Sequence, residues 1–172
     1  MIEIKLNSAE QLLNSFDPSP FRERDLDDRA ADYILDTAEE LALRGPVRLI
    51  IELPQEQAAR ELTQQLPAAV HNSFEYRANH ARRQLRELFR YGRLSLAVGL
   101  AVLALCVLTI HLLGLPAMQS TFAQMTEQGL FIVGWVAIWR PLEIFLFDWW
   151  PITKRIDLLQ RLSKAEIEIR PL

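Results

Sequence analysis

Apolar and charged residues alternate at both ends of the chain. The opening MIEIKL places Ile2, Ile4 and Leu6 on one side of an extended backbone, and AEIEIR at residues 165–170 repeats the alternation. A period of two is typical of half-buried strands, whereas the apolar run VRLIIEL at residues 47–53 indicates a more central one. Because an isolated strand pair is barely stable in water, we expect one sheet, with residues 47–53 between or beside the other two.

Apolar positions at helical spacing predict the elements between these strands. A helix is expected over residues 25–44, after a turn-rich connection over residues 7–24, with Asp25 or Asp27 near its N-cap. Its predicted inner face comprises Leu26, Ala30, Tyr33, Ile34, Ala38 and Leu41. A second helix over residues 55–66 is interrupted by Pro67, which is well placed to begin a long third helix.

A long uncharged stretch follows the third helix's polar part. Residues 94–115 contain no Asp, Glu, Lys or Arg. At ~1.5 Å per residue this segment would extend about 33 Å, enough to cross a ~30 Å hydrocarbon core. It also repeats small residues four apart, Ser95 with Gly99 and Ala97 with Ala101, which permits close helix contact.

A second span is expected over residues 122–148, after a short loop at 116–121. Its most apolar part, residues 129–139, is too short alone, but its extension in both directions gives a helix of adequate length. An amphipathic helix over residues 152–164 then leads to the last strand. Since that strand must reach the sheet, the chain has to cross the membrane an even number of times.

The charge distribution supports the same topology. The chain has a net charge of −3, but residues 1–75 are acidic, residues 76–93 carry six arginines and one glutamate, and the loop at 116–121 has no Lys or Arg. Basic residues flank membrane spans on the cytoplasmic side. Both termini are therefore expected in the cytoplasm, and MIEIKLNSAEQ lacks the pattern of a cleaved signal peptide.

These elements predict an α+β membrane protein with a two-helix transmembrane hairpin and a small cytoplasmic domain. The sheet of that domain would combine N-terminal, central and C-terminal strands. The expected parts are a cytoplasmic α+β domain (1–66), a basic stalk helix (67–93), transmembrane helix 1 (94–115), a periplasmic loop (116–121), transmembrane helix 2 (122–148), and a cytoplasmic amphipathic helix with the last strand (149–172).

WRPLEIFLFDWWP, at residues 139–151, is the segment with the most candidate chemistry. Arg140 and Glu143 are three apart on a helix and can form an ion pair, while Pro141 frees the carbonyl near Ala137. Ionisable groups at membrane depth are costly and are usually paired or functional. The pair can be structural, with Arg140 snorkelling to the interface, or it can belong to a water-filled or ion-conducting path.

Further residues of this segment and of the stalk are expected to anchor the protein at the membrane. Aromatic residues favour the membrane–water boundary, and arginines that precede a span are expected to contact anionic lipid head groups rather than nucleic acid. The predicted interfacial anchors are Trp139, Asp148, Trp149 and Trp150, and the predicted head-group contacts are Arg82, Arg86, Arg90 and Arg93.

Sequence motifs for catalysis and cofactor binding are absent. The single cysteine, Cys106, excludes a disulfide within the chain and a multi-cysteine metal site, and no phosphate loop, dinucleotide fingerprint, HExxH or CxxC occurs. We therefore expect no enzyme, no metal and no cofactor.

Three stretches carry a family resemblance. DPSPFRERDLD from Asp17, AVHNSFEYRA leading into RRQLRELFRYGRLSL, and GWVAIWRPLEIFLFDWWP from Gly134 together resemble a family of small uncharacterised bacterial inner-membrane proteins. The resemblance implies a bacterial inner-membrane location and transfers no catalytic residue.

The expected function is that of a non-enzymatic, self-associating inner-membrane protein that presents its acidic domain to a cytoplasmic protein partner. Burying Arg140 and Glu143 away from lipid is easier in a homo-oligomer than in a two-span monomer. The alternative is an oligomeric channel that uses the same two residues.

Overall fold

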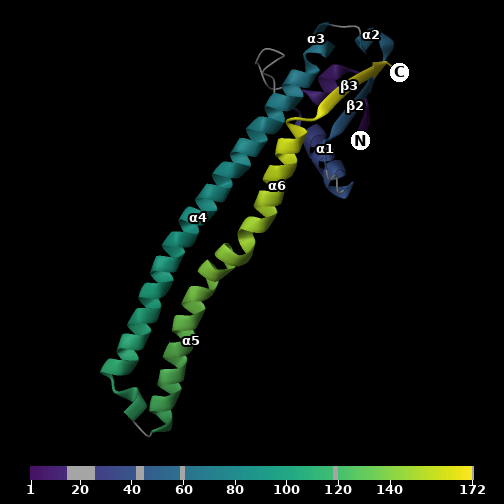
Figure 1. Cartoon of the computed structure of the whole chain (residues 1–172). Coiled ribbons are helices and arrows are strands. Elements are labelled where there is room, and N and C mark those ends of the chain that lie inside the picture. Colours follow the sequence, from purple (N-terminus) through teal and green to yellow (C-terminus); the bar gives the residue numbers. More distant parts are fainter. Residues whose placement is uncertain (15–25, 42–44, 59–60, 118–119, 172) are drawn as a thin grey trace. The chain divides into compact units, whose positions relative to one another are not determined.

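The computed structural model describes residues 1–14, 26–41, 45–58, 61–117 and 120–171 (Figure 1). Two compact units divide the chain: Met1–Arg82 together with Lys154–Leu172 form the first, and Arg83–Thr153 forms the second. The first unit combines both ends of the chain, and the second is a helical hairpin.

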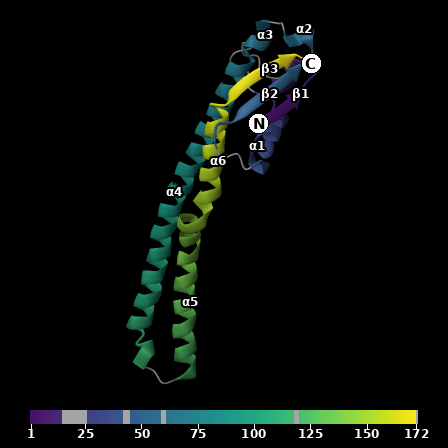
Figure 2. The same ribbon diagram turned by 45° about the vertical axis from the view of Figure 1, so that its right-hand side comes forward.

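A three-stranded parallel sheet lies in the first unit. Its strands are β1 (Ile2–Lys5), β2 (Arg48–Leu53) and β3 (Glu166–Pro171), in the order β1-β2-β3. Figure 2 shows β2 between the two terminal strands. The sequence prediction of one sheet with three strands from these segments is confirmed, with residues 47–53 in the central position.

The strand register gives the sheet one apolar face. Ile2, Leu49 and Ile167 are aligned across the three strands, and Ile4, Ile51 and Ile169 form the next row. Leu49, Ile51 and Ile2 are almost completely buried. Because side chains alternate between faces, the charged residues of β1 and β3 lie on the opposite side.

Helix α1 (Asp28–Glu40) begins at the predicted N-cap, Asp27. The Asp27 carboxylate accepts hydrogen bonds from the amides of Arg29 at 3.0 Å and Ala30 at 3.3 Å. Asp25 lies outside the described residues. The buried residues of this helix are Ala31, Ile34, Leu35 and Ala38.

Two residues of the predicted inner face of α1 are instead exposed. Tyr33 and Leu41 lie on the surface, while Ala31 and Leu35, which the prediction left out, are buried. The observed buried face therefore differs from the predicted one at its flanks, while Ile34 and Ala38 belong to both. The small or amphipathic side chains beside these two residues fit either flank, so the sequence pattern does not distinguish the two faces.

A short 3-10 helix that the sequence pattern did not predict precedes α1. It spans Ala9–Leu12, with Ser8 as N-cap, and buries Ala9 and Leu12. The rest of the predicted turn-rich connection, residues 15–25, lies outside the described residues.

The predicted second helix is present as two short pieces, α2 (Gln55–Ala58) and α3 (Glu61–Gln64). Helix α4 then extends over 47 residues, Leu66–Leu112, with Pro67 in its first turn as predicted. Pro67 is tolerated there because the first turn of a helix has free amide groups.

The first turns of α4 belong to the core of the first unit. Buried side chains from Leu66, Val70, Phe74 and Ala78 make this segment a structural part of that unit, which continues to Arg82 and does not end at residue 66. Two polar contacts also connect it within the unit: His71 Nε2 lies 2.8 Å from the Ala165 carbonyl, and Arg77 pairs with Asp28 of α1 at 2.7 Å.

The return helix continues past residue 148, where the second span was expected to end. Helix α5 (Thr121–Glu143) begins at the N-cap Ser120, a π-helical segment covers Ile144–Asp148, and α6 covers Trp149–Leu162. The expected separate helix over residues 152–164 is therefore part of this continuous helical run. Pro151 lies in the third position after the π-helical segment, and the helix continues through it.

Within the described residues, two helical stretches are long and apolar enough to cross a membrane: Leu66–Leu112 and Thr121–Leu162. The second stretch contains the predicted span 122–148, and the first contains the predicted span 94–115 except for its last three residues. Gly114, with φ of 60°, and the 3-10 turn Leu115–Ala117 end the first stretch. Residues 118 and 119 of the predicted loop lie outside the described residues.

Candidate functional site

The helical hairpin of the second unit has three close contacts at glycines. A Cβ placed on Gly92 would lie 2.9 Å from a methyl carbon of Ile144, one on Gly99 would lie 2.6 Å from the Ala137 carbonyl oxygen, and one on Gly134 would lie 2.7 Å from a methyl carbon of Leu103. These distances are too short for any other residue without a shift. The two helices are therefore antiparallel and pack at the distance that glycine permits.

Buried positions on the side of α4 that faces α5 recur every seven residues. Gly92, Gly99 and Cys106 are all buried and are separated by seven residues each. A period of seven is that of a left-handed pair of helices packed along one seam. Of the predicted small-residue pairs, Ser95 with Gly99 is partly buried in this seam, whereas Ala97 and Ala101 are exposed.

Gly99 meets the carbonyl that Pro141 leaves free. Proline lacks the amide hydrogen that would bond to the Ala137 carbonyl four residues earlier. The backbone of α4 approaches this carbonyl oxygen at Gly99, where a Cα–H group can face it. A proline in one helix and a glycine in the other thus act together at one contact.

Pro141 is also the start of the irregular part of the return helix. The amide of Ile144 bonds to the carbonyls of both Arg140 and Pro141, and the π-helical turn follows directly. Phe145 stacks on Phe89 of α4, with ring centroids 6.1 Å apart. Turns of this kind occur as single bulges in α-helices, frequently at functional sites.

Arg140 pairs with two carboxylates across this irregular turn. Its guanidinium lies 3.1 Å from Glu143 and 3.2 Å from Asp148, and Trp139 Nε1 donates to the other Glu143 oxygen at 2.9 Å. The structure therefore brings together four of the predicted site residues. We call Trp139, Arg140, Glu143 and Asp148 the Arg140 cluster.

The pairing with Asp148 was missed from sequence. Eight residues on a regular α-helix leave two side chains about 80° apart around the axis. One wider π-helical turn removes most of that offset and aligns Asp148 with Arg140. A proline followed by bulky apolar residues was the available signal, but it does not specify the position of a π turn.

The Arg140 cluster faces away from the seam. Pro141 and Ile144 are buried, whereas the side chains of Arg140, Glu143 and Asp148 are 56%, 40% and 31% exposed. One guanidinium against two carboxylates also leaves the cluster with a net charge of −1. The geometry can stabilise the helix locally and leaves charged groups accessible on the outer surface of the hairpin.

The two remaining predicted anchors follow immediately. Trp149 Nε1 donates to the Phe145 carbonyl at 3.0 Å, and its ring meets Trp150 edge to face at 5.9 Å. Trp150 itself is exposed. The Trp149 hydrogen bond satisfies a carbonyl in the π-helical segment, so this residue stabilises the irregular turn in addition to any role at an interface.

The predicted head-group residues lie along α4 in two different settings. Arg82 contacts the side-chain amide of Gln160 in the first unit. Arg86, Arg90 and Arg93 are exposed and have no ion-pair partner within the described part of the chain. Three of the four arginines are thus available to an external anion.

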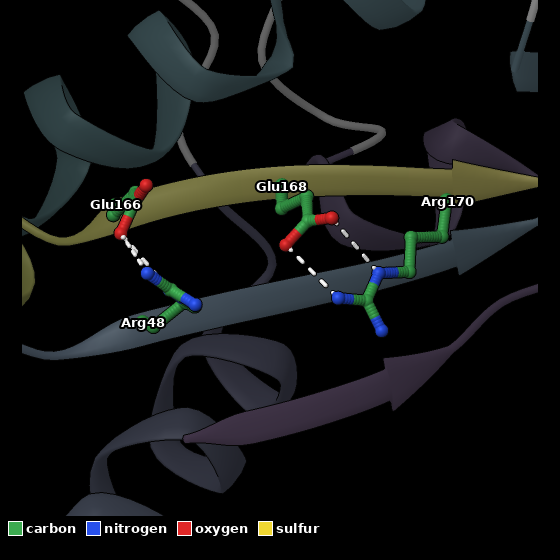
Figure 3. Close-up of polar contacts among 4 residues, drawn as sticks. All are labelled: Arg48, Glu166, Glu168 and Arg170. Carbon is green, nitrogen blue, oxygen red and sulfur yellow. Dashed lines mark hydrogen bonds and ion pairs between the residues drawn. The ribbon is translucent and has the colours of Figure 1, made fainter.

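A charged surface on the first unit was not predicted as a site. Arg48 pairs with Glu166 across β2 and β3 at 2.9 Å, and Glu168 accepts two hydrogen bonds from Arg170 at 2.9 and 3.1 Å (Figure 3). The hydrogen bond from Arg170 lowers the pKa of Glu168 below its usual value, and Glu168 in turn raises the pKa of Arg170. The alternation of charged residues in AEIEIR was the signal for this surface.

Neither metal chemistry nor a known family assigns a function. Among the residues that the structure describes, no group of three or more His, Cys, Asp or Glu side chains could hold a metal ion. Comparison with protein-family models, curated proteins and solved structures finds no match to this chain.

Proposed function

We propose that this chain is a non-enzymatic, self-associating protein of a bacterial inner membrane that presents its α+β unit to a cytoplasmic protein partner. Its two spans form a hairpin, and both termini lie in the cytoplasm. The bacterial origin rests on the resemblance of three sequence stretches to a bacterial family. The remaining parts of the proposal rest on charges, exposure and strand pairing.

The observation that carries the topology is the pairing of both terminal strands with β2. β1 contains residues 2–5 and β3 contains residues 166–171, and both belong to one compact unit. If the two long apolar helices cross the bilayer, the chain must return to the side from which it started. The exposed Arg86, Arg90 and Arg93 favour the cytoplasm for that side.

Self-association is supported by the outward position of the Arg140 cluster. A charged residue costs about 2.5–3.5 kcal/mol at the centre of a membrane helix, and less toward the interface where the Arg140 cluster is expected. A second copy would cover these groups and the exposed aromatic rings of Trp135 and Trp139 beside them. Pairing between copies therefore removes both a polar and an aromatic surface from lipid.

Topology reporters test the membrane arrangement. Reporters that are active only in the periplasm, fused after residue 172 and within residues 116–121, should be inactive and active respectively. Activity of the C-terminal fusion would contradict the two-span hairpin.

Crosslinking in native membranes tests self-association, because recovery of monomer alone would remove that part of the proposal.

An ion pathway is the second candidate, favoured by the two carboxylates that Arg140 does not fully neutralise. Ion flux into proteoliposomes that contain the purified protein distinguishes the two functions. A pathway lined by the cluster should conduct cations, and Glu143→Gln should lower the flux. A scaffold should give no flux above that of empty liposomes for either protein.

A further inference from the structure

A cavity of about 620 Å³ lies between α4 and α5, and its lining residues do not include any of the Arg140 cluster. Three polar side chains from consecutive turns of α5, Gln124, Glu127 and Gln128, line it together with apolar side chains. Among the apolar ones are Val107 and Ile110 of α4. Its size falls in the range of small-molecule sites, and its mixture of apolar walls with a few polar groups is typical of them.

Glu127 gives the cavity its charge. It is the only Asp, Glu, Lys or Arg in the sequence between Arg93 and Arg140. The residue as a whole is half-buried, and its carboxylate has no ion-pair partner within the described residues. A carboxylate among apolar side chains is costly unless a cation or hydrogen-bond donors compensate it, so the cavity favours a positively charged group.

An apolar groove adjoins this cavity along α4. Leu100, Leu103, Ala104 and Leu108 line it, and Val107 lines both the groove and the cavity. The groove has a volume of about 650 Å³ and carries His111 as its one ionisable lining residue. A ligand with a cationic head in the cavity can therefore extend a hydrocarbon chain along Leu100–Leu108 without meeting another charge.

We infer that the cavity binds a phospholipid with a primary ammonium head group, of the phosphatidylethanolamine class. The Glu127 carboxylate accepts hydrogen bonds from the ammonium, the amides of Gln124 and Gln128 donate to the phosphate, and an acyl chain occupies the groove. An anionic head group would meet Glu127 with no Lys or Arg nearby. This inference rests on the proposed membrane insertion of the hairpin.

Native mass spectrometry of the full chain in detergent tests this assignment. The protein is incubated with equal amounts of phosphatidylethanolamine, phosphatidylglycerol or phosphatidylcholine. Retention of the ethanolamine lipid should exceed that of the other two, because phosphatidylglycerol is anionic and the quaternary choline has no N–H to donate. Glu127→Gln should lower its retention about tenfold, equivalent to about 1.4 kcal/mol.

Glu87→Gln is the matched control, since it removes an exposed carboxylate of the second unit that lies outside the cavity. It should leave retention of the ethanolamine lipid unchanged. A second variant, Ile110→Trp, fills the cavity and should lower retention of that lipid while Glu127 remains. Equal retention by wild type and Glu127→Gln, or equal retention of all three lipids, would overturn the inference.

A competition with butylammonium distinguishes a lipid site from a site for a free amine. Butylammonium added in excess should not displace the lipid, whereas full displacement would show that the cavity recognises a free amine and would overturn the assignment to a lipid. Carbonate extraction of native membranes tests the premise of membrane insertion. Release of the wild type would contradict that insertion, whereas a retained protein without lipid preference would overturn this inference alone.

Discussion

Gly99 and Gly129 show how the same residue type serves different purposes in the two helices of the hairpin. Gly99 faces the Ala137 carbonyl so closely that a methyl group would overlap it, whereas nothing lies within 4 Å of the position that a Cβ would take on Gly129. Glycine usually weakens a helix relative to alanine. At Gly99 the close packing of the two helices compensates for the low helix propensity of glycine. At Gly129 no close contact offsets that low propensity.

Alanine at these two positions should consequently have opposite effects. Gly99→Ala should lower the free energy of unfolding by about 1–3 kcal/mol, because the new methyl group meets backbone that cannot move without shifting a helix. Gly129→Ala should leave it unchanged or raise it by up to about 1 kcal/mol. Unfolding of the purified protein in mixed micelles measures both. Equal effects of the two variants would contradict the close approach of α4 to α5 at Gly99.

Glu168 provides a pH-dependent test at the residue scale. Its pKa is lowered from an ordinary value of 4.5 by the hydrogen bond from Arg170. Since the folded pKa lies below the unfolded one, the contribution to stability is present above pH 4.5 and is lost as the pH falls through the folded value.

The NMR titration of the labelled Glu168 carboxyl should therefore have its midpoint below 4.5. Arg170→Gln should return the midpoint toward 4.5. Arg48→Gln is the control, because Arg48 is the weakest of the influences on Glu168 and its removal should move the midpoint less. A midpoint that does not respond to Arg170→Gln would show that the hydrogen bond does not persist in solution.

The return helix shows which features an element's sequence determines. The three-residue spacing of Arg140 and Glu143 predicted their proximity, and Pro141 predicted a free carbonyl at Ala137. The partner of that carbonyl, Gly99, and the pairing with Asp148 could not be predicted. The first depends on how two distant segments align, and the second depends on one π-helical turn whose position no local pattern fixes.

The strands were more predictable than the helix boundaries, because a strand's burial pattern is visible locally whereas the end of a helix depends on distant contacts. Alternation at residues 1–6 and 165–170 reports burial on one side directly, and the apolar run at residues 47–53 reports burial on both. The helix over residues 152–164 was expected to be separate from the second span, yet one helical run continues through Pro151. A proline marks a possible end of a helix, and the packing on either side determines whether the helix ends there.

The Arg140 cluster leads to a prediction of non-additive effects at the element scale. Glu143→Gln or Asp148→Asn alone should lower the free energy of unfolding by less than about 1 kcal/mol, because Arg140 retains the other carboxylate. Together they leave the guanidinium without a partner. The loss in the double variant should exceed the sum of the single losses by at least about 0.5 kcal/mol.

The four proteins of this double-mutant cycle can be compared by unfolding in mixed micelles. The same cycle in an Arg140→Gln background is the control, where the coupling between the two carboxylates should disappear. Additive losses with Arg140 present would mean that the guanidinium does not bridge both carboxylates.

At the scale of the whole molecule, β3 (residues 166–171) brings the C-terminal part of the chain into the same sheet as the N-terminal strand β1. β3 supplies one edge of a sheet whose other edge is β1, and the apolar row Ile2, Leu49 and Ile167 extends across all three strands. The hairpin of residues 83–153 is a separate compact unit. Damage to β3 should therefore affect the first unit and spare the second.

Ile167→Asp tests this division, because it places a carboxylate in the apolar row. Full burial of such a group without a partner costs about 1–3 kcal/mol, and the half-buried position of Ile167 sets the expected loss at the lower end of this range. In membrane vesicles with the first unit exposed, a protease should cleave residues 1–82 of the variant faster than those of the wild type. Glu168→Gln, on the opposite face of the same strand, should not have this effect.

The protected fragment shows where the damage stops. If the sheet stabilises only the first unit, the fragment covering residues 83–153 should remain membrane-bound and of equal size in wild type, Ile167→Asp and Glu168→Gln. Loss of that fragment in Ile167→Asp alone would show that the hairpin depends on the sheet and that the two units do not fold independently. A carboxylate in the apolar row that all three strands share should destabilise the whole sheet. Equal cleavage of residues 1–82 in all three proteins would therefore show that β3 contributes nothing to the stability of the first unit.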